Sequence, residues 1–297
     1  MSKEQRAKVD TMLRQPRPEG GRSIEELREG FKKRMSAMKV PPGIRTSAAK
    51  LGARPALLVE ALDRQRPGTV LYFHGGGFVI GSPETALSLT ANLVVRSGMR
   101  ALSLDYRLAP EHPFPAALDD GLAAYRALLD GGEAPSRIAF AGDSAGGCLA
   151  ITTCLLARDA GLPMPAAIVA FSPDLDATRT GESMGTKAGI DPLFTRESLN
   201  HTAALYLAGQ DPDQPLASPA VRADLRGFPP MLLQAGGNEL LLDDATRMAA
   251  RARSAGVDVI LDVTADVPHV FQSFAGVLDE ADEALDRAVL VLTQRLR

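Results

Sequence analysis

Short runs of apolar residues recur along most of the chain, and they constrain its fold more than any other feature. Most are continuous rather than alternating, which is typical of strands buried on both faces of a parallel sheet. Helical patterns lie between them, at 116–129 and 244–255, and such strand–helix alternation predicts an α/β sheet with right-handed crossovers. The predicted strands are residues 69–73, 100–104, 138–141, 167–171, 231–234 and 257–263.

The segments outside this alternation predict edge strands and a cap. Residues 45–62 are expected to add one or two antiparallel edge strands. Residues 1–45 are expected to form N-terminal cap helices, because Ser23 and Glu26 make a capping-box pattern and an apolar face follows at helical spacing. An insertion at about 176–211, with a helical patch at 197–207, is expected to add to the cap of a catalytic domain spanning 46–297. The apolar face consists of Ile24, Leu27, Phe31, Met35 and Met38.

The sequence leaves two roles open for the N-terminal helices. They either pack over the core or form a lid, in which case Phe31 and Met35 line a pocket.

Composition and charge exclude several function classes. The 297 residues carry a formal net charge of -3 and have no Lys/Arg tract, so nucleic acid is not an expected partner. No stretch of about 18 apolar residues predicts a membrane span, and the N-terminus lacks an apolar signal region, which predicts a cytoplasmic protein. Cys148 and Cys154 are expected to be small buried residues rather than a disulfide or a zinc site, and no metal is expected.

A G-x-S-x-G pentapeptide, Gly142-Asp143-Ser144-Ala145-Gly146, lies between a predicted strand and a predicted helix. A serine on a tight strand-to-helix turn needs small neighbours, and the turn exposes its hydroxyl above the sheet. Ser144 is therefore the predicted nucleophile, with a simple helix N-cap serine as the alternative.

Three glycines, at positions 75–77, follow His74 directly after the first central strand. Glycines in such a place can present bare N–H groups to the oxyanion that forms during ester cleavage. We expect the N–H groups of Gly76, Gly77 and Ala145 to be the donors, and His74 to orient the loop. No phosphate-loop pattern is present.

His269 is the predicted general base for Ser144. It follows the last predicted strand, so its loop can reach back over the sheet, and the chain order of serine, acid and histidine fits this fold. The acid should follow the preceding strand. Glu239 is preferred, and Asp243 remains the alternative, because either carboxylate could orient the imidazole. Asp191 is excluded at this point because it lies in the insertion.

These motifs together resemble the bacterial branch of the hormone-sensitive-lipase-like family of α/β-hydrolase esterases. The similar text is HGGGFVIGS at 74–82, LDYRLAPEHPFPAAL at 104–118, GDSAGG at 142–147, GGNELLLDDA at 236–245 and VPHVFQ at 267–272. The resemblance implies an α/β-hydrolase fold and hydrolysis of short- to medium-chain acyl esters, without a cofactor. It also implies Glu239 at the acid position.

The resemblance carries further expectations about the site and the assembly. Asp105, Arg107 and Glu111 are expected to form a buried polar network near the nucleophile. Asp174 stands where relatives often have an aromatic residue, which would widen or polarise the acyl pocket. A homodimer through the last strand is an option. The alternative functions are a lactonase or amidase on the same triad and a non-catalytic ligand-binding homologue.

Overall fold

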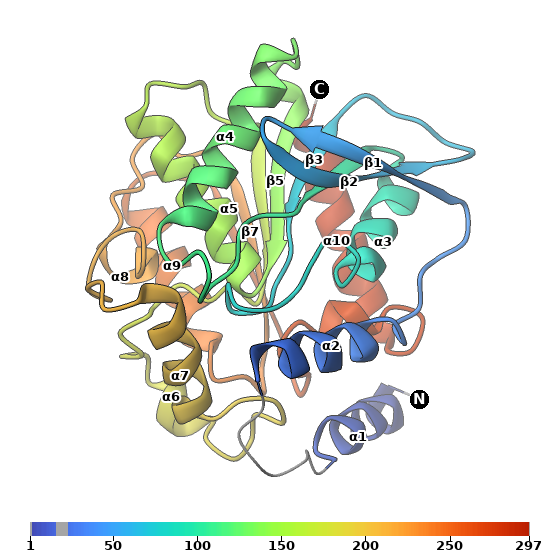
Figure 1. Cartoon of the computed structure of the whole chain (residues 1–297). Helices are drawn as coiled ribbons and strands as arrows, with labels where there is room; N and C mark the ends of the chain where they lie inside the picture. Colours follow the sequence, from blue (N-terminus) through green and yellow to red (C-terminus); the bar gives the residue numbers. More distant parts are fainter. Residues whose placement is uncertain (1, 16–22, 297) are drawn as a thin grey trace.

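One eight-stranded, mostly parallel sheet forms the centre of the molecule, which confirms the predicted α/β class. The computed structural model describes residues 2–15 and 23–296 (Figure 1). The strand order is β1-β2-β4-β3-β5-β6-β7-β8; β1 with β2 and β2 with β4 are antiparallel, and all other neighbours are parallel. The strands are β1 (Ile44–Leu51), β2 (Arg54–Ala61), β3 (Thr69–Phe73), β4 (Arg100–Leu104), β5 (Ile138–Asp143), β6 (Ala167–Phe171), β7 (Met231–Gly236) and β8 (Val259–Thr264).

The predicted strands are confirmed, and three of them, β3, β4 and β6, match to the residue. Strands β5 and β7 each continue two residues further, and β8 begins two residues later than expected. The predicted edge strands form the hairpin β1–β2. All residues of β3, β6 and β7 are buried, as continuous apolar runs predict, whereas β8 lies at the sheet edge and has no fully buried residue.

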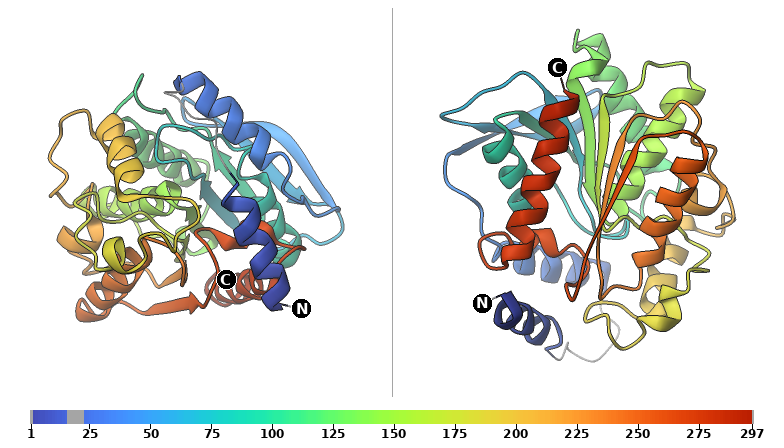
Figure 2. Two further views of the ribbon diagram at one scale, coloured as in Figure 1. Left: turned by 90° about the horizontal axis from the view of Figure 1, so that it is seen from below. Right: turned by 180° about the vertical axis from the view of Figure 1, so that it is seen from behind.

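Helices cover both faces of the sheet and enclose two apolar cores (Figure 2). Helices α4 (Ala116–Asp130), α5 (Ala145–Asp159) and α9 (Leu242–Ser254) pack against one face, while α3 (Leu87–Ser97) and α10 (Asp279–Arg295) pack against the other. The short 3-10 helices are η1 (Pro135–Arg137) and η2 (Phe271–Phe274).

The remaining helices gather at one end of the molecule, opposite the C-terminus (Figure 1). They are α1 (Ser2–Leu13), α2 (Ile24–Met35), α6 (Ser183–Thr186) and α7 (Arg196–Leu207), with α8 (Pro219–Arg222) beside them. The Ser23–Glu26 capping box of α2 is confirmed. The predicted N-terminal helical region also includes residues 1 and 16–22, which lie outside the described residues, and the domain boundaries stay a prediction.

The two N-terminal helices differ in how they are anchored. Val9 of α1 is buried in a small core with Phe271, Phe274 and Leu278, next to α10. No residue of α2 is fully buried, and its predicted apolar face is only half-buried. Over residues 2–15 and 23–296, no helix is both long and apolar enough to cross a bilayer.

Candidate active site

Ser144 lies on a strained turn between β5 and α5. Its backbone has φ 54° and ψ −120°, a region that L-residues rarely occupy and that is found at functional turns. A Cβ at Gly142 would meet the carbonyl of Gly146, and a Cβ at Gly146 would meet the carbonyls of Phe73 and His74. The small residues of the pentapeptide are therefore required by backbone packing, as the motif predicts.

The loop after β3 also depends on glycine. Gly76 and Gly77 have φ values of 124° and 62°, and a Cβ at Gly77 would meet the side chain of Thr202 on α7. Among the described residues, the N–H groups of Gly76, Gly77 and Ala145 donate no hydrogen bond to the protein. These three donors are therefore free to bind a ligand oxygen.

His74 supports this loop from inside the protein. Its ring is fully buried, stacks on Tyr106 with 4.1 Å between ring centroids, and its Nδ1 lies 2.9 Å from Gly75 O. Burial lowers the pKa of His74 to about 4, so the ring is neutral at pH 7. The Tyr106 hydroxyl donates to His74 O at 2.6 Å. A neutral, buried ring of this kind fits the predicted loop-support role.

Asp143 joins the serine turn to the glycine loop. Its carboxylate accepts from the Tyr72 hydroxyl at 2.8 Å and from Gly75 N at 3.1 Å. Burial raises the pKa of Asp143 to about 6, against the lowering effects of the Tyr72 bond and of a nearby charge on His269. The motif predicted only a small turn here, and did not indicate this link.

His269 and Glu239 form a buried pair. Their Nδ1 and Oε2 atoms lie 2.5 Å apart, and the side chains are 5% and 0% exposed. The second Glu239 oxygen accepts from Gly236 N at 2.7 Å, which fixes the carboxylate at the end of β7. Burial lowers the pKa of His269, but the charge and hydrogen bond of Glu239 outweigh it, so that the pKa is raised overall.

The loop that carries His269 is held beside the serine turn. Val270 N donates to Ser172 Oγ at 2.9 Å, and Ser172 is the residue after β6, the neighbour of β5. Ser144 N in turn donates to Phe171 O at 2.9 Å. The nucleophile candidate thus follows β5 and the acid candidate follows β7. The loop of the base candidate, which comes after β8, is held between them by Ser172 at the end of β6.

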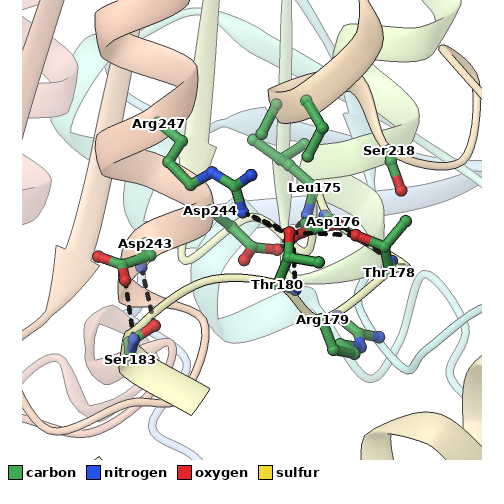
Figure 3. Close-up of polar contacts among 12 residues, drawn as sticks. Leu175, Asp176, Thr178, Arg179, Thr180, Ser183, Ser218, Asp243, Asp244 and Arg247 are labelled. Carbon is green, nitrogen blue, oxygen red and sulfur yellow. Dashed lines mark hydrogen bonds and ion pairs between the residues drawn. The ribbon is translucent and has the colours of Figure 1, made fainter. Parts of the chain in front are cut away.

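Asp243, the alternative acid, contacts the insertion instead of His269 (Figure 3). Its carboxylate accepts from Ser183 N at 2.8 Å. The neighbouring Asp244 is buried and accepts from Leu175 N at 2.6 Å and Asp176 N at 2.9 Å. The first turn of α9 therefore anchors the insertion.

The predicted network of Asp105, Arg107 and Glu111 is wrong in its pairing. Arg107 binds Asp120 instead, with contacts of 2.8 to 3.0 Å. Glu111 is half-exposed and pairs with Arg28 of α2 at 2.7 Å. The Asp174 side chain does not stand free either, because it forms an ion pair with Arg179, which is buried.

Asp191, which the sequence interpretation excluded as the triad acid, instead contacts the segment that carries Glu239. It accepts from Leu240 N at 2.8 Å, next to Glu239, and its charge contributes to the raised pKa of His269. The ring of Phe194 packs edge-on against the His269 ring, with 5.0 Å between the ring centroids. No short-range pattern marks this contact, because it joins the insertion to a segment 49 residues further along the chain.

Cys148 and Cys154 are buried free thiols. Within the described ranges, no group of three or more His, Cys, Asp or Glu residues could hold a metal ion.

A family model described as the alpha/beta hydrolase fold matches residues 70–273. The chain belongs to the α/β-hydrolase family. An acetyl-hydrolase of Streptomyces hygroscopicus is 42% identical over 252 residues, which cover 84% of this chain and 82% of that protein. The carboxylesterase NlhH of Mycobacterium tuberculosis is 35% identical, covering 76% and 73%.

Solved structures place this α/β-hydrolase in the hormone-sensitive-lipase branch. A crystal structure of an esterase from the bacterial hormone-sensitive lipase family matches with a TM-score of 0.95 and 42% identity, over 99% of both chains. The crystal structure of EstE5, soaked with p-nitrophenyl butyrate, matches with a TM-score of 0.93 and 39% identity, over 98% of both chains. The resemblance predicted from the motifs is confirmed.

Proposed function

We propose that this α/β-hydrolase is a serine carboxylic-ester hydrolase that cleaves short- to medium-chain acyl esters through an acyl-enzyme intermediate. The observation that carries the proposal is the buried Glu239–His269 pair, held beside the strained turn of Ser144. The esterase and carboxylesterase names of the relatives support the same class of reaction.

Glu239 orients the base in this mechanism. Its Oε2 accepts the Nδ1 proton of His269, which leaves Nε2 as the nitrogen that takes the proton of Ser144. Ser144 Oγ then attacks the ester carbonyl, and the alcohol leaves with the proton from His269. Water repeats the sequence on the acyl-enzyme and releases the acid.

The oxyanion of each tetrahedral intermediate binds the N–H groups of Gly76, Gly77 and Ala145. All three lack another acceptor among the described residues, and Ala145 is the first residue of α5, where the helix dipole favours negative charge. In comparable sites, removal of one such donor costs about 10² to 10³ in rate.

The decisive experiment compares the wild type with Ser144→Ala on p-nitrophenyl esters from acetate to palmitate. Loss of the nucleophile should lower kcat by about 10⁶-fold. A folded wild type that cleaves no ester of any length would contradict the proposal. A wild type that prefers lactones or amides would instead keep the triad and change the substrate class.

We also propose that the enzyme forms a homodimer through β8. This strand is the last of the sheet, and Ile260, Leu261 and Val263 on it are 48%, 39% and 44% exposed. An apolar edge strand with unpaired backbone groups tends to pair with another chain. Sedimentation of the wild type and of Ile260→Lys tests this: the wild type should be dimeric and the variant monomeric, and a monomeric wild type would contradict the proposal.

A further inference from the structure

Arg28 connects the cap to the glycine loop through its guanidinium. Its Nε donates to Val79 O at 3.0 Å, and its Nη2 donates to Ala109 O at 3.0 Å. Glu111 holds the outer side of the group with two contacts of 2.7 Å. Arg28 is only 28% exposed, so its charge acts on the Val79 carbonyl with limited screening by water.

The Val79 carbonyl begins a chain of hydrogen-bonded peptide groups. It shares a peptide group with the N–H of Ile80, which donates to Gly76 O at 3.0 Å. The Gly76 carbonyl shares a peptide group with the N–H of Gly77, which has no acceptor among the described residues. Two peptide groups, aligned in the same sense, therefore lie between the cation and the free donor.

Hydrogen bonds in such a chain polarise one another, by roughly 10–30% per bond. A cation at the carbonyl end draws electron density from each N–H in turn. We propose that Arg28 is a positioning residue of the oxyanion hole, which acts through Val79, Ile80 and Gly76 to make the Gly77 N–H a stronger donor. This inference rests on the proposed function, in which Gly77 binds the oxyanion.

The same contacts hold the turn in place. Val79 N also donates to Gly76 O, at 3.1 Å, and Ala109 N donates to Phe78 O at 2.8 Å. Arg28 binds both segments, at Val79 O and Ala109 O. The direction of the Gly77 N–H is thus fixed by a residue of a helix that has no fully buried side chain.

Arg28→Gln tests the proposal, with Glu111→Gln as the matched control. The first variant removes the charge at Val79 O. The second removes the charge of the ion-pair partner, but leaves the carbonyl contacts of Arg28. One oxyanion donor contributes about 10²- to 10³-fold in rate. If polarisation by Arg28 accounts for about a fifth to a third of the corresponding free energy, Arg28→Gln should lower kcat about threefold to tenfold. The loss should be equal for p-nitrophenyl acetate and butyrate, with KM little changed, and Glu111→Gln should stay within about twofold of the wild type.

A trifluoromethyl ketone that adds to Ser144 gives a direct reading of the oxyanion. Titration of the bound hemiketal by ¹⁹F NMR should show a proton affinity higher in Arg28→Gln than in the wild type by the same threefold to tenfold factor. A role of Arg28 confined to docking α2 on the protein would not move this value.

Two results would overturn the proposal while the proposed function stands. One is an unchanged kcat and an unchanged hemiketal titration in a folded Arg28→Gln. The other is an effect of Arg28→Gln that appears only in KM or only with the longer ester, or a loss of kcat that Glu111→Gln reproduces. Either pattern would indicate that Arg28 only docks α2 on the protein. A wild type that hydrolyses no ester would instead refute the proposed function itself.

Discussion

Exchange of Glu239 for Gln should remove most of the catalytic power, whereas Asp243→Asn should not. Glu239 Oε2 lies 2.5 Å from His269 Nδ1, with both side chains almost fully buried. At an effective dielectric constant of about 20 and a charge separation of about 4 Å, this carboxylate stabilises the imidazolium by about 4 kcal/mol. That energy corresponds to about 10³ in kcat.

The amide adds a second loss, because its NH₂ group favours the His269 tautomer with the proton on Nε2, which cannot accept the Ser144 proton. We therefore expect kcat of Glu239→Gln to fall by about 10³- to 10⁴-fold. Asp243→Asn loses only the charge of the Ser183 contact, and kcat should stay within about tenfold.

The assay is steady-state hydrolysis of p-nitrophenyl butyrate, with circular dichroism to verify that each variant is folded. A thousandfold loss in Asp243→Asn, with Glu239→Gln close to the wild type, would refute the reasoning.

Two further predictions concern pH and packing. His269 must be neutral to accept a proton, so kcat/KM of the wild type should fall as pH drops through a pKa that Glu239 holds above the ordinary histidine value. In Glu239→Gln the lowering effect of burial is opposed only by the smaller raising effects of the Asp191 and Asp143 charges, so the fall in kcat/KM should move to lower pH. Profiles from about pH 5 to about pH 8 would show an unmoved acidic limb if the account is wrong. Gly146→Ala should destabilise the fold by at least about 2 kcal/mol in urea unfolding, because the new Cβ meets two backbone carbonyls. The control Gly185→Ala, which has open space around its Cβ, should change stability by less than about 1 kcal/mol, and equal values for the two would contradict the packing argument.

The sheet could be predicted closely because its central strands are buried on both faces, so their apolar runs stand out in the sequence. Ser144 and the glycine loop were equally readable, because close contacts around both turns require glycine, and these glycines form short motifs in the sequence. In each case the signal lies within a few neighbouring residues.

Contacts between distant segments could not be read in this way. Whether Glu239 or Asp243 faces His269 depends on where α9 begins, and helix boundaries are poorly defined by sequence. Asp191 reaches Leu240 N only after the insertion has folded, and the pairing of Glu111 with Arg28 joins two segments far apart in the chain.

The first turn of α9 limits how the enzyme can be recombined with its relatives. Asp243 and Asp244 hold the insertion at Ser183, Leu175 and Asp176, while Arg247 binds Asp176 at 2.7 Å. A chimera that exchanges only the insertion would keep these three side chains but replace the backbone turn, and the Asp176 carboxylate, that they bind. Crossover points that place the insertion and residues 239–247 on the same parental fragment would transfer the anchors with the cap.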